Sequence, residues 1–324
     1  MALTLYLQFD EMRSGSSMNS TAVDTKGWTV LALIGWSSDY LASKEFESPR
    51  LTSELLLCHV LNCGRIDLYT NFDKLLTAAQ LAQFKSHLKR RLAHEPVQYI
   101  VGSTDFMGLH LEIDPRTLIP RPETEVLVEQ VISQVRGIPS EAPSKSPAQR
   151  LQILDIGTGS GNIAVSLAKF LPGAQVVGLD ASPRALELAR RNVELLDLGD
   201  RVKLMEHDIR TGKGVLEAGS FDYVVSNPPY IPASDMDSLP PEVREFEPPL
   251  ALQVEGDGLE YFGIISTLGQ VLLKKGGWVF YEVGFGQDAA VSSILSDVGF
   301  TGVESVRDYG GILRVVKGRV APLG

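Results

Sequence analysis

From Leu151 onwards the chain alternates between apolar runs of strand length and amphipathic runs of helix length. The predicted strands span 151–156, 175–179, 202–206, 221–226 and 278–283, and closing strands are expected near 301–306 and 312–317. The predicted helices span 162–170, 182–196, 259–273 and 287–298. This alternation predicts an α/β domain with a doubly wound, mostly parallel sheet. Ligands of such sheets bind at the carboxyl ends of the strands.

A glycine-rich turn, Gly157-Thr158-Gly159-Ser160-Gly161, joins the first of these strands to its helix. The missing side chains let a ligand approach the backbone N–H groups at the start of the helix. Asn162 stands where a dinucleotide fingerprint would have its third glycine, so the spacing favours a smaller adenosyl ligand over NAD. Taken alone, the turn is equally typical of a tight strand-to-helix connection.

Carboxylates end the next two strands. Asp180 closes the second strand, where it can accept hydrogen bonds from both hydroxyls of a ribose. Asp208 follows the third strand and can accept from an adenine amino group, with Ile209 covering the face of the base. Either aspartate by itself is as typical of a helix cap or a turn. Together with the glycine-rich turn, they favour a nucleoside-binding site.

The fourth strand ends in Asn227-Pro228-Pro229-Tyr230. The two prolines fix their own φ angles and exclude Asn227 from the helical region, so the loop is stiff. The Asn227 side-chain oxygen and the Pro228 carbonyl can both accept hydrogen bonds in one pocket, with the Tyr230 ring as a wall. Such a pocket suits a planar group with an NH2: a carboxamide, or the exocyclic amine of adenine or cytosine. Positioning of two reactants can supply up to roughly 7–11 kcal/mol of a barrier, so we expect it to be the main catalytic device.

The part of the chain before residue 118 predicts a small helical domain. Two helices are expected between Trp28 and Asn62, separated by Ser48-Pro49. A third opens with the capping box Thr77-x-x-Gln80. The basic end of this third helix predicts a solvated face, and a docking surface for an acidic partner or for RNA is the alternative. It contains Lys85, Lys89, Arg90 and Arg91.

A β-hairpin is expected after the helices, with strands at Val97–Val101 and Leu109–Ile113. An amphipathic helix then ends near Val135, and a Pro/Ser-rich linker covers 137–149. The expected organisation is a disordered extension over 1–25, a helical substrate-docking domain over 26–95, a bridging hairpin over 96–117 and a catalytic domain over 118–324.

Composition narrows the function classes. The 324 residues carry a net charge of −10 and a pI near 5.1, which disfavours a nucleic-acid partner. Cys58 and Cys63 lack the further ligands of a zinc site, so we expect reduced core cysteines in a cytosolic protein. The apolar runs are too short to span a bilayer, and the apolar start lacks the basic region of a signal peptide. No membrane partner is therefore expected.

Taken together, 157–161, Asp180, Asp208 and 227–230 resemble the successive motifs of class I S-adenosylmethionine-dependent methyltransferases that act on an amino nitrogen. Three more segments resemble the HemK/PrmC family, the release factor glutamine methyltransferases: 95–100, 105–108 and 118–125. The similarity runs from about Trp28 to Arg319. It implies a seven-stranded class I fold with S-adenosylmethionine as cofactor. The implied reaction is N5-methylation of the glutamine in the Gly-Gly-Gln motif of bacterial peptide chain release factors.

The resemblance also implies roles for individual residues. The cofactor would contact Gly157, Thr158, Gly159, Ser160, Gly161, Asp180, Asp208, Ile209 and Asn227. The substrate amide would meet the catalytic residues Asn227, Pro228, Pro229 and Tyr230. Phe106, Arg121 and Glu123 match family segments near the mouth of the site and would bind substrate. The structural alternative is that Phe106 packs the hairpin and that the other two cap the next helix. No metal is expected, and no histidine is placed as a catalytic base.

Two other substrates fit the same loop. One is a glutamine of a ribosomal protein, which differs only in how the helical domain docks it. The other is the N6 amine of adenine in DNA or RNA, which the acidic charge and the lack of a basic, aromatic-rich segment disfavour. A non-enzymatic sensor of an adenosyl ligand is a further alternative, and it requires that the bound ligand is never turned over.

Overall fold

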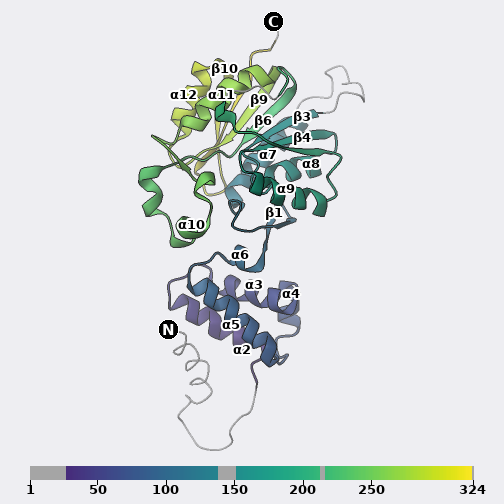
Figure 1. Ribbon diagram of the computed structural model, residues 1–324, viewed down its shortest axis with the longest axis vertical. Coiled ribbons are helices and arrows are strands. Elements are labelled where there is room, and N and C mark those ends of the chain that lie inside the picture. Colours follow the sequence, from purple (N-terminus) through teal and green to yellow (C-terminus); the bar gives the residue numbers. More distant parts are fainter. Residues whose placement is uncertain (1–26, 138–150, 212–215, 323–324) are drawn as a thin grey trace, which may run out of the picture. The chain divides into compact units, whose positions relative to one another are not determined.

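The computed structural model describes residues 27–137, 151–211 and 216–322 (Figure 1). The chain divides into two compact units, Met1–Phe84 and Lys85–Gly324. The predicted extension over 1–25 lies outside the described residues, as does the predicted linker except for Gly137. The division falls within helix α5 (Ala78–Leu92), and the domain limits expected at residues 95 and 117 stay predictions.

The first unit is helical, as predicted. It contains α2 (Val30–Ala42), α3 (Pro49–Leu61), the short α4 (Arg65–Thr70), which was not expected, and the start of α5. The capping box of α5 is confirmed: the Thr77 N–H donates to Gln80 Oε1 at 2.9 Å, and the Gln80 N–H donates to Thr77 Oγ1 at 3.2 Å. Fully buried leucines form the core of this unit, among them Leu33, Leu41, Leu56 and Leu57.

The predicted first hairpin strand is wrong, because Val97–Val101 forms the short helix α6. Pro96 precedes this helix and Gly102 ends it with φ +79°, the usual order of these residues around a helix. The hairpin follows as β1 (Ser103–Phe106) and β2 (Leu109–Glu112), which pair antiparallel. Its two-residue turn has positive φ at both positions, as a tight right-twisted hairpin requires.

The sheet of the second unit has seven strands in the order β10-β11-β9-β6-β3-β4-β5. The parallel strands are β3 (Leu151–Ile156), β4 (Ala174–Asp180), β5 (Val202–Glu206), β6 (Phe221–Ser226) and β9 (Leu273–Glu282). The antiparallel strands are β10 (Phe300–Arg307) and β11 (Leu313–Val320). The predicted seven-stranded, mostly parallel sheet is confirmed. The chain leaves β3 toward β4 on one side and β6 lies on the other, so a crevice forms at the carboxyl ends of these strands.

Helices cover both faces of this sheet (Figure 1). One apolar core joins the strands to α7 (Pro122–Arg136), α8 (Asn162–Phe170), α9 (Pro183–Leu195) and the hairpin. The other joins them to α11 (Glu260–Leu272) and α12 (Asp288–Asp297). The helices and strands predicted from residue 151 onwards are confirmed within a few residues, except that β9 begins five residues early.

One segment of the second unit was not predicted. After β6 the chain forms β7 (Ile231–Pro232), the 3-10 turn η2 (Ala233–Ser238), α10 (Pro241–Phe246), the 3-10 turn η3 (Pro249–Ala251) and β8 (Gln253–Val254). Here 231–254 is called the insertion. Within the ranges that the structure covers, no helix is long and apolar enough to cross a membrane.

Candidate active site

A cavity lies at the carboxyl ends of β3, β4, β5 and β6. Its wall combines backbone from the glycine-rich turn, acidic side chains from the strand ends and apolar side chains from α11 and the insertion. The residues that line it include Gly157, Thr158, Gly159, Ser160, Asp180, Asp208, Ile209, Asn227, Pro228, Pro229, Arg121, Thr124, Leu250, Tyr261 and Ile265. Most of the site residues expected from the sequence are thus brought together.

The glycine-rich turn is folded tightly against the end of β4. The N–H groups of Gly157 and Thr158 both donate to the Leu179 carbonyl at 2.8 Å. Gly157 and Gly159 have φ +75° and +55°, which side-chain-bearing residues rarely adopt. Gly161 does not line the cavity, and a Cβ there would meet Ala189 of α9 at 3.3 Å. Gly161 therefore allows α8 and α9 to pack closely.

A buried carboxyl supports this turn from below. Asp155, fully buried at the end of β3, accepts a hydrogen bond from Thr158 Oγ1 at 2.6 Å. Burial raises the pKa of Asp155 to about 7, against an ordinary value of 3.8, since the charged form loses its hydration. This hydrogen bond holds Thr158, and with it the turn, against the end of β3.

Asp180 is held in one orientation by backbone N–H groups. Gly159 donates to its Oδ2 and Ser182 to its Oδ1, both at 2.8 Å. Burial raises the pKa of Asp180. A carboxylate has about four acceptor sites, so capacity remains for the two hydroxyls of a ribose.

Asp208 is paired with a cation from its own loop. Arg210 Nη2 lies 2.7 Å from Asp208 Oδ2, and hydrogen bonds from Arg210 lower the pKa of Asp208. The carboxylate therefore stays charged and remains an acceptor, as its predicted role requires. Ile209 beside it is buried, and Tyr261 lines the same part of the cavity.

Asn227 lies at the cavity with its amide nitrogen already engaged. Asn227 Nδ2 donates to Thr124 Oγ1 at 3.3 Å, and Thr124 Oγ1 donates to Glu282 Oε2 at 2.6 Å. Burial raises the pKa of Glu282 to about 7. The Asn227 oxygen is then the end of the amide that can accept from a ligand.

Tyr230 does not line the cavity. Its ring packs against the core on the α11 and α12 side, and a Cβ on Gly284 would lie 3.0 Å from Tyr230 Cδ2. Its carbonyl accepts from Gln287 Nε2 at 3.0 Å. The ring is therefore placed beside the loop, where it supports the loop rather than forming the expected wall.

The three residues expected at the mouth occupy different places. Arg121 lines the cavity, and its guanidinium pairs with Glu247 of the insertion. Phe106 is 1% exposed and packs in the core with the hairpin, which agrees with the structural alternative. Glu123 lies in the first turn of α7 and does not line the cavity. Arg121 occupies the N-cap position of α7, but its side chain makes no cap hydrogen bond.

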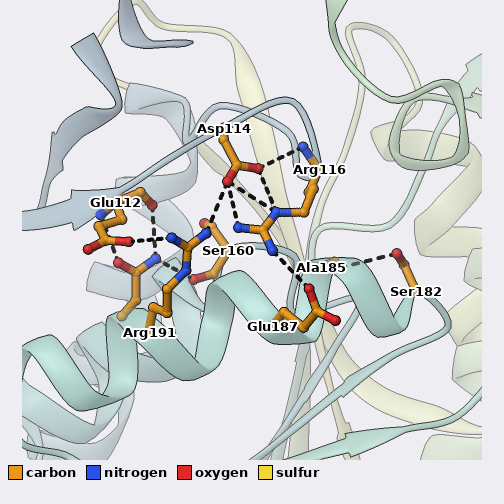
Figure 2. A network of polar contacts seen from close by, with 9 residues as sticks. Glu112, Asp114, Arg116, Ser160, Ser182, Ala185, Glu187 and Arg191 are labelled. Atoms are coloured by element: carbon orange, nitrogen blue, oxygen red, sulfur yellow. Dashed lines mark hydrogen bonds and ion pairs between the residues drawn. The ribbon is translucent and has the colours of Figure 1, made fainter.

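A polar network connects the glycine-rich turn to the end of the hairpin strand β2 and to the residues that follow it (Figure 2). Asn192 of α9 donates to the carbonyls of Ser160 at 2.9 Å and Glu112 at 3.0 Å, and accepts from the Glu112 N–H at 2.7 Å. Arg116, a cavity-lining residue, bridges Asp114 and Glu187. The network gives the turn a fixed position relative to α9.

Several residues of this arrangement were not found from the sequence, among them Thr124, Asn192, Glu247 and Glu282. One of them carried a usable pattern. Glu282 is a single acidic residue at the carboxyl end of an apolar strand, the same position that singled out Asp180 and Asp208. The others depend on contacts between residues that are distant in the sequence.

Two family models match the chain. One, described as "PrmC N-terminal domain", matches residues 32–102, and one described as "Methyltransferase domain" matches residues 148–268. The second range contains the glycine-rich turn, both carboxylates and Asn227.

Proteins named release factor glutamine methyltransferase are similar over nearly their whole length. The one from Geobacter sulfurreducens is 43% identical over 90% of this chain and 97% of its own, and the one from Rhodopirellula baltica is 41% identical over 92% and 98%. A solved protein-(glutamine-N5) methyltransferase, release factor-specific, from Alicyclobacillus acidocaldarius is 31% identical, with 65% of this chain and 100% of that chain covered and a TM-score of 0.37. With a methyltransferase domain and relatives of this identity and coverage, the chain belongs to the release factor glutamine methyltransferase family.

Proposed function

We propose that this protein transfers a methyl group from S-adenosylmethionine to N5 of the glutamine in the Gly-Gly-Gln motif of bacterial peptide chain release factors. Family membership supports the reaction, since the relatives carry this activity in their names. The observation that carries it is the placement of Asn227 on the cavity wall, next to Pro228 and beside the glycine-rich turn, with its amide nitrogen engaged by Thr124.

The cavity fits the adenosyl cofactor that the family implies. The backbone of 157–160 is free of bulky side chains, Asp180 presents oriented acceptors for ribose hydroxyls, and Asp208 is an ionised acceptor beside the apolar faces of Ile209 and Tyr261. Gly161 would contribute through helix packing. When bound, S-adenosylmethionine supplies a methyl group already activated by its sulfonium charge.

In this proposal the protein binds and orients the side-chain amide of the substrate glutamine, which is unreactive by itself. The nitrogen lone pair of a carboxamide is delocalised into the carbonyl, so its N–H groups must be gripped to favour a pyramidal nitrogen. Asn227 Oδ1 and the Pro228 carbonyl are the two acceptors proposed for this, on a loop that its two prolines stiffen. Each hydrogen bond contributes only about 1 kcal/mol net, whereas fixed geometry contributes up to roughly 7–11 kcal/mol.

The other residues have supporting parts in this proposal. Pro229 and Tyr230 fix the loop, the latter from outside the cavity. Arg121 would bind substrate at the mouth, and substrate contacts of Phe106 and Glu123 stay predictions. The helical domain would dock the release factor. Because release factors act in translation termination, we expect the protein in the cytoplasm.

Mass spectrometry tests the proposal directly. Purified release factor is incubated with the protein and S-adenosylmethionine, and the peptide that contains Gly-Gly-Gln is analysed. We expect one added methyl on the glutamine side chain and none in a release factor whose glutamine is replaced by alanine. Methylation of a ribosomal protein or of adenine instead would replace this proposal by one of the alternative substrates.

A further inference from the structure

Glu282 is a buried acidic residue next to the proposed substrate site, where it is bonded to the cavity-lining Thr124. It is the last residue of β9, the strand next to β6, and its neighbour Tyr281 pairs with Ser226, which precedes Asn227. The side chain of Glu282 is buried, with the residue 2% exposed, and it does not line the cavity. It meets the site through Thr124, which is also 2% exposed and stands in the first turn of α7. A side-chain hydrogen bond with Asn227 also lowers the pKa of Glu282, so the carboxyl lies beside the Asn227 amide as well.

The hydrogen bonds are donated toward the carboxylate: Asn227 donates to Thr124, and Thr124 donates to Glu282. An ionised carboxylate can only accept, so the single hydroxyl proton of Thr124 is committed to Glu282 Oε2 at 2.6 Å. Toward Asn227, Thr124 Oγ1 can then only accept. Asn227 must therefore present its NH2 to Thr124, at 3.3 Å, and keep its oxygen for the cavity.

We propose that Glu282 is a positioning residue which, through Thr124, sets the orientation of the Asn227 amide so that Oδ1 accepts from the substrate. The inference rests on the proposed function for its consequence in catalysis. The orientation itself is a property of the protein alone.

The charge of Glu282 decides whether the hydrogen bonds from Asn227 to Thr124 and from Thr124 to Glu282 keep these directions. Burial raises the pKa of Glu282 to about 7, so the group changes charge in the neutral range. A protonated carboxyl can donate to Thr124, which frees the threonine proton to turn toward Asn227 and permits the reversed amide. The groups that face Glu282 are Thr124 and Glu123 of α7, Asn227 and Tyr230 of the loop after β6, and Arg314 of β11.

Steady-state kinetics with release factor form the first test. Glu282→Gln keeps the shape but can offer Thr124 an NH2, so we expect kcat to fall about 10- to 100-fold, the size expected when a buried hydrogen-bonding group loses its proper partner. The Kd for S-adenosylmethionine should change by less than about 2-fold, because Glu282 lies outside the cavity. Wild-type kcat should rise with pH through about 7, and this rise should be absent in Glu282→Gln.

Matched variants separate positioning from folding. Thr124→Ser keeps the hydroxyl and should retain kcat within about 3-fold, whereas Thr124→Val, of similar shape, should lose as much as Glu282→Gln. Asp222→Asn is the control, since Asp222 is a partly buried acidic residue at the opposite end of β6, bonded to Lys274. It should leave kcat unchanged. Equal losses in Thr124→Ser and Thr124→Val, or a normal kcat and pH profile in Glu282→Gln, would overturn the inference.

Nuclear magnetic resonance of the protein without substrate tests the effect of Glu282 on the Asn227 side-chain amide independently of the reaction. The side-chain NH2 resonances of Asn227, assigned by comparison with Asn227→Asp, should shift with pH around 7 in the wild type and stay constant in Glu282→Gln. If this shift is present but no methyl reaches release factor, the proposed function fails and the positioning role stands. If the NH2 resonances do not change with pH in either the wild type or Glu282→Gln, the positioning role of Glu282 is wrong.

Discussion

The two ends of the Asn227 side-chain amide have different roles. Its nitrogen is fixed by Thr124, and its oxygen belongs to the cavity wall formed by the loop after β6. Because an amide has one acceptor and one donor end, the value of this residue lies in its orientation as much as in its presence.

Replacing Asn227 with alanine should therefore damage turnover much more than cofactor binding. We expect kcat to fall by about two to three powers of ten, the size seen when one oriented group of an active site is removed. The Kd for S-adenosylmethionine should stay within a few fold, because the glycine-rich turn and Asp180 are untouched. Methyl-transfer kinetics together with calorimetric titration of the cofactor measure both. A near-normal kcat would contradict the assignment.

Asp155 gives a pH dependence of stability with a definite sign. Its pKa is raised from 3.8 to about 7 in the folded protein, so the folded state binds this proton more tightly than the unfolded state. The free energy of unfolding of the wild type should therefore fall relative to that of Asp155→Asn as the pH rises from 3.8 to about 7. Above about pH 7 the difference between the two proteins should stay constant. We expect a change of more than about 1.4 kcal/mol, equivalent to one pKa unit. Urea unfolding of both proteins at several pH values measures it, and a difference independent of pH would contradict it.

At the scale of elements, the sequence predicts what local pattern controls. The strand at 151–156 and the helix at 162–170 are found at the predicted residues, since apolar periodicity and the glycine-rich turn fix their ends. The prediction of a strand at Val97–Val101 is wrong because a short apolar run is compatible with a helix or a strand equally well. The insertion was missed because its pieces are too short to show a period.

Contacts across the sheet were beyond prediction for a different reason. Thr124 and Glu282 are separated by 158 residues, and Asn192 and Glu112 by 80, so nothing local connects them. The carboxyl ends of the strands are predictable from topology, which is why Asp180, Asp208 and Asn227 were found. Residues that reach the same edge from helices depend on the finished packing.

Asn192 should stabilise the conformation of the glycine-rich turn, because it bonds the Ser160 carbonyl. Its side chain makes three hydrogen bonds and is fully buried, so Asn192→Ala leaves several buried groups without partners. We expect the free energy of unfolding to fall by about 2–4 kcal/mol and the affinity for S-adenosylmethionine to fall with it. Urea unfolding and cofactor titration measure these effects. Arg190→Ala, at an exposed position of the same helix, is the control, and equal behaviour of the two variants would contradict the role.

At the scale of the whole molecule, the charge separates the substrate classes. The chain has 40 acidic and 30 basic residues, so a nucleic-acid substrate would meet a repulsive average field. We expect no binding to single-stranded or duplex DNA tighter than about 10⁻⁴ M at physiological salt, the weak end of non-specific binding. Fluorescence anisotropy across a range of salt concentrations measures it. Tight binding with a steep salt dependence would favour the adenine alternative.

The central claim is that the loop at Asn227 grips the glutamine amide for methyl transfer. A crystal structure of the protein with a Gly-Gly-Gln peptide and the demethylated cofactor measures this most directly. We predict Asn227 Oδ1 and the Pro228 carbonyl within about 3.2 Å of the glutamine amide nitrogen, at hydrogen-bond distance. An Asn227 side chain that faces away from that nitrogen would contradict the account.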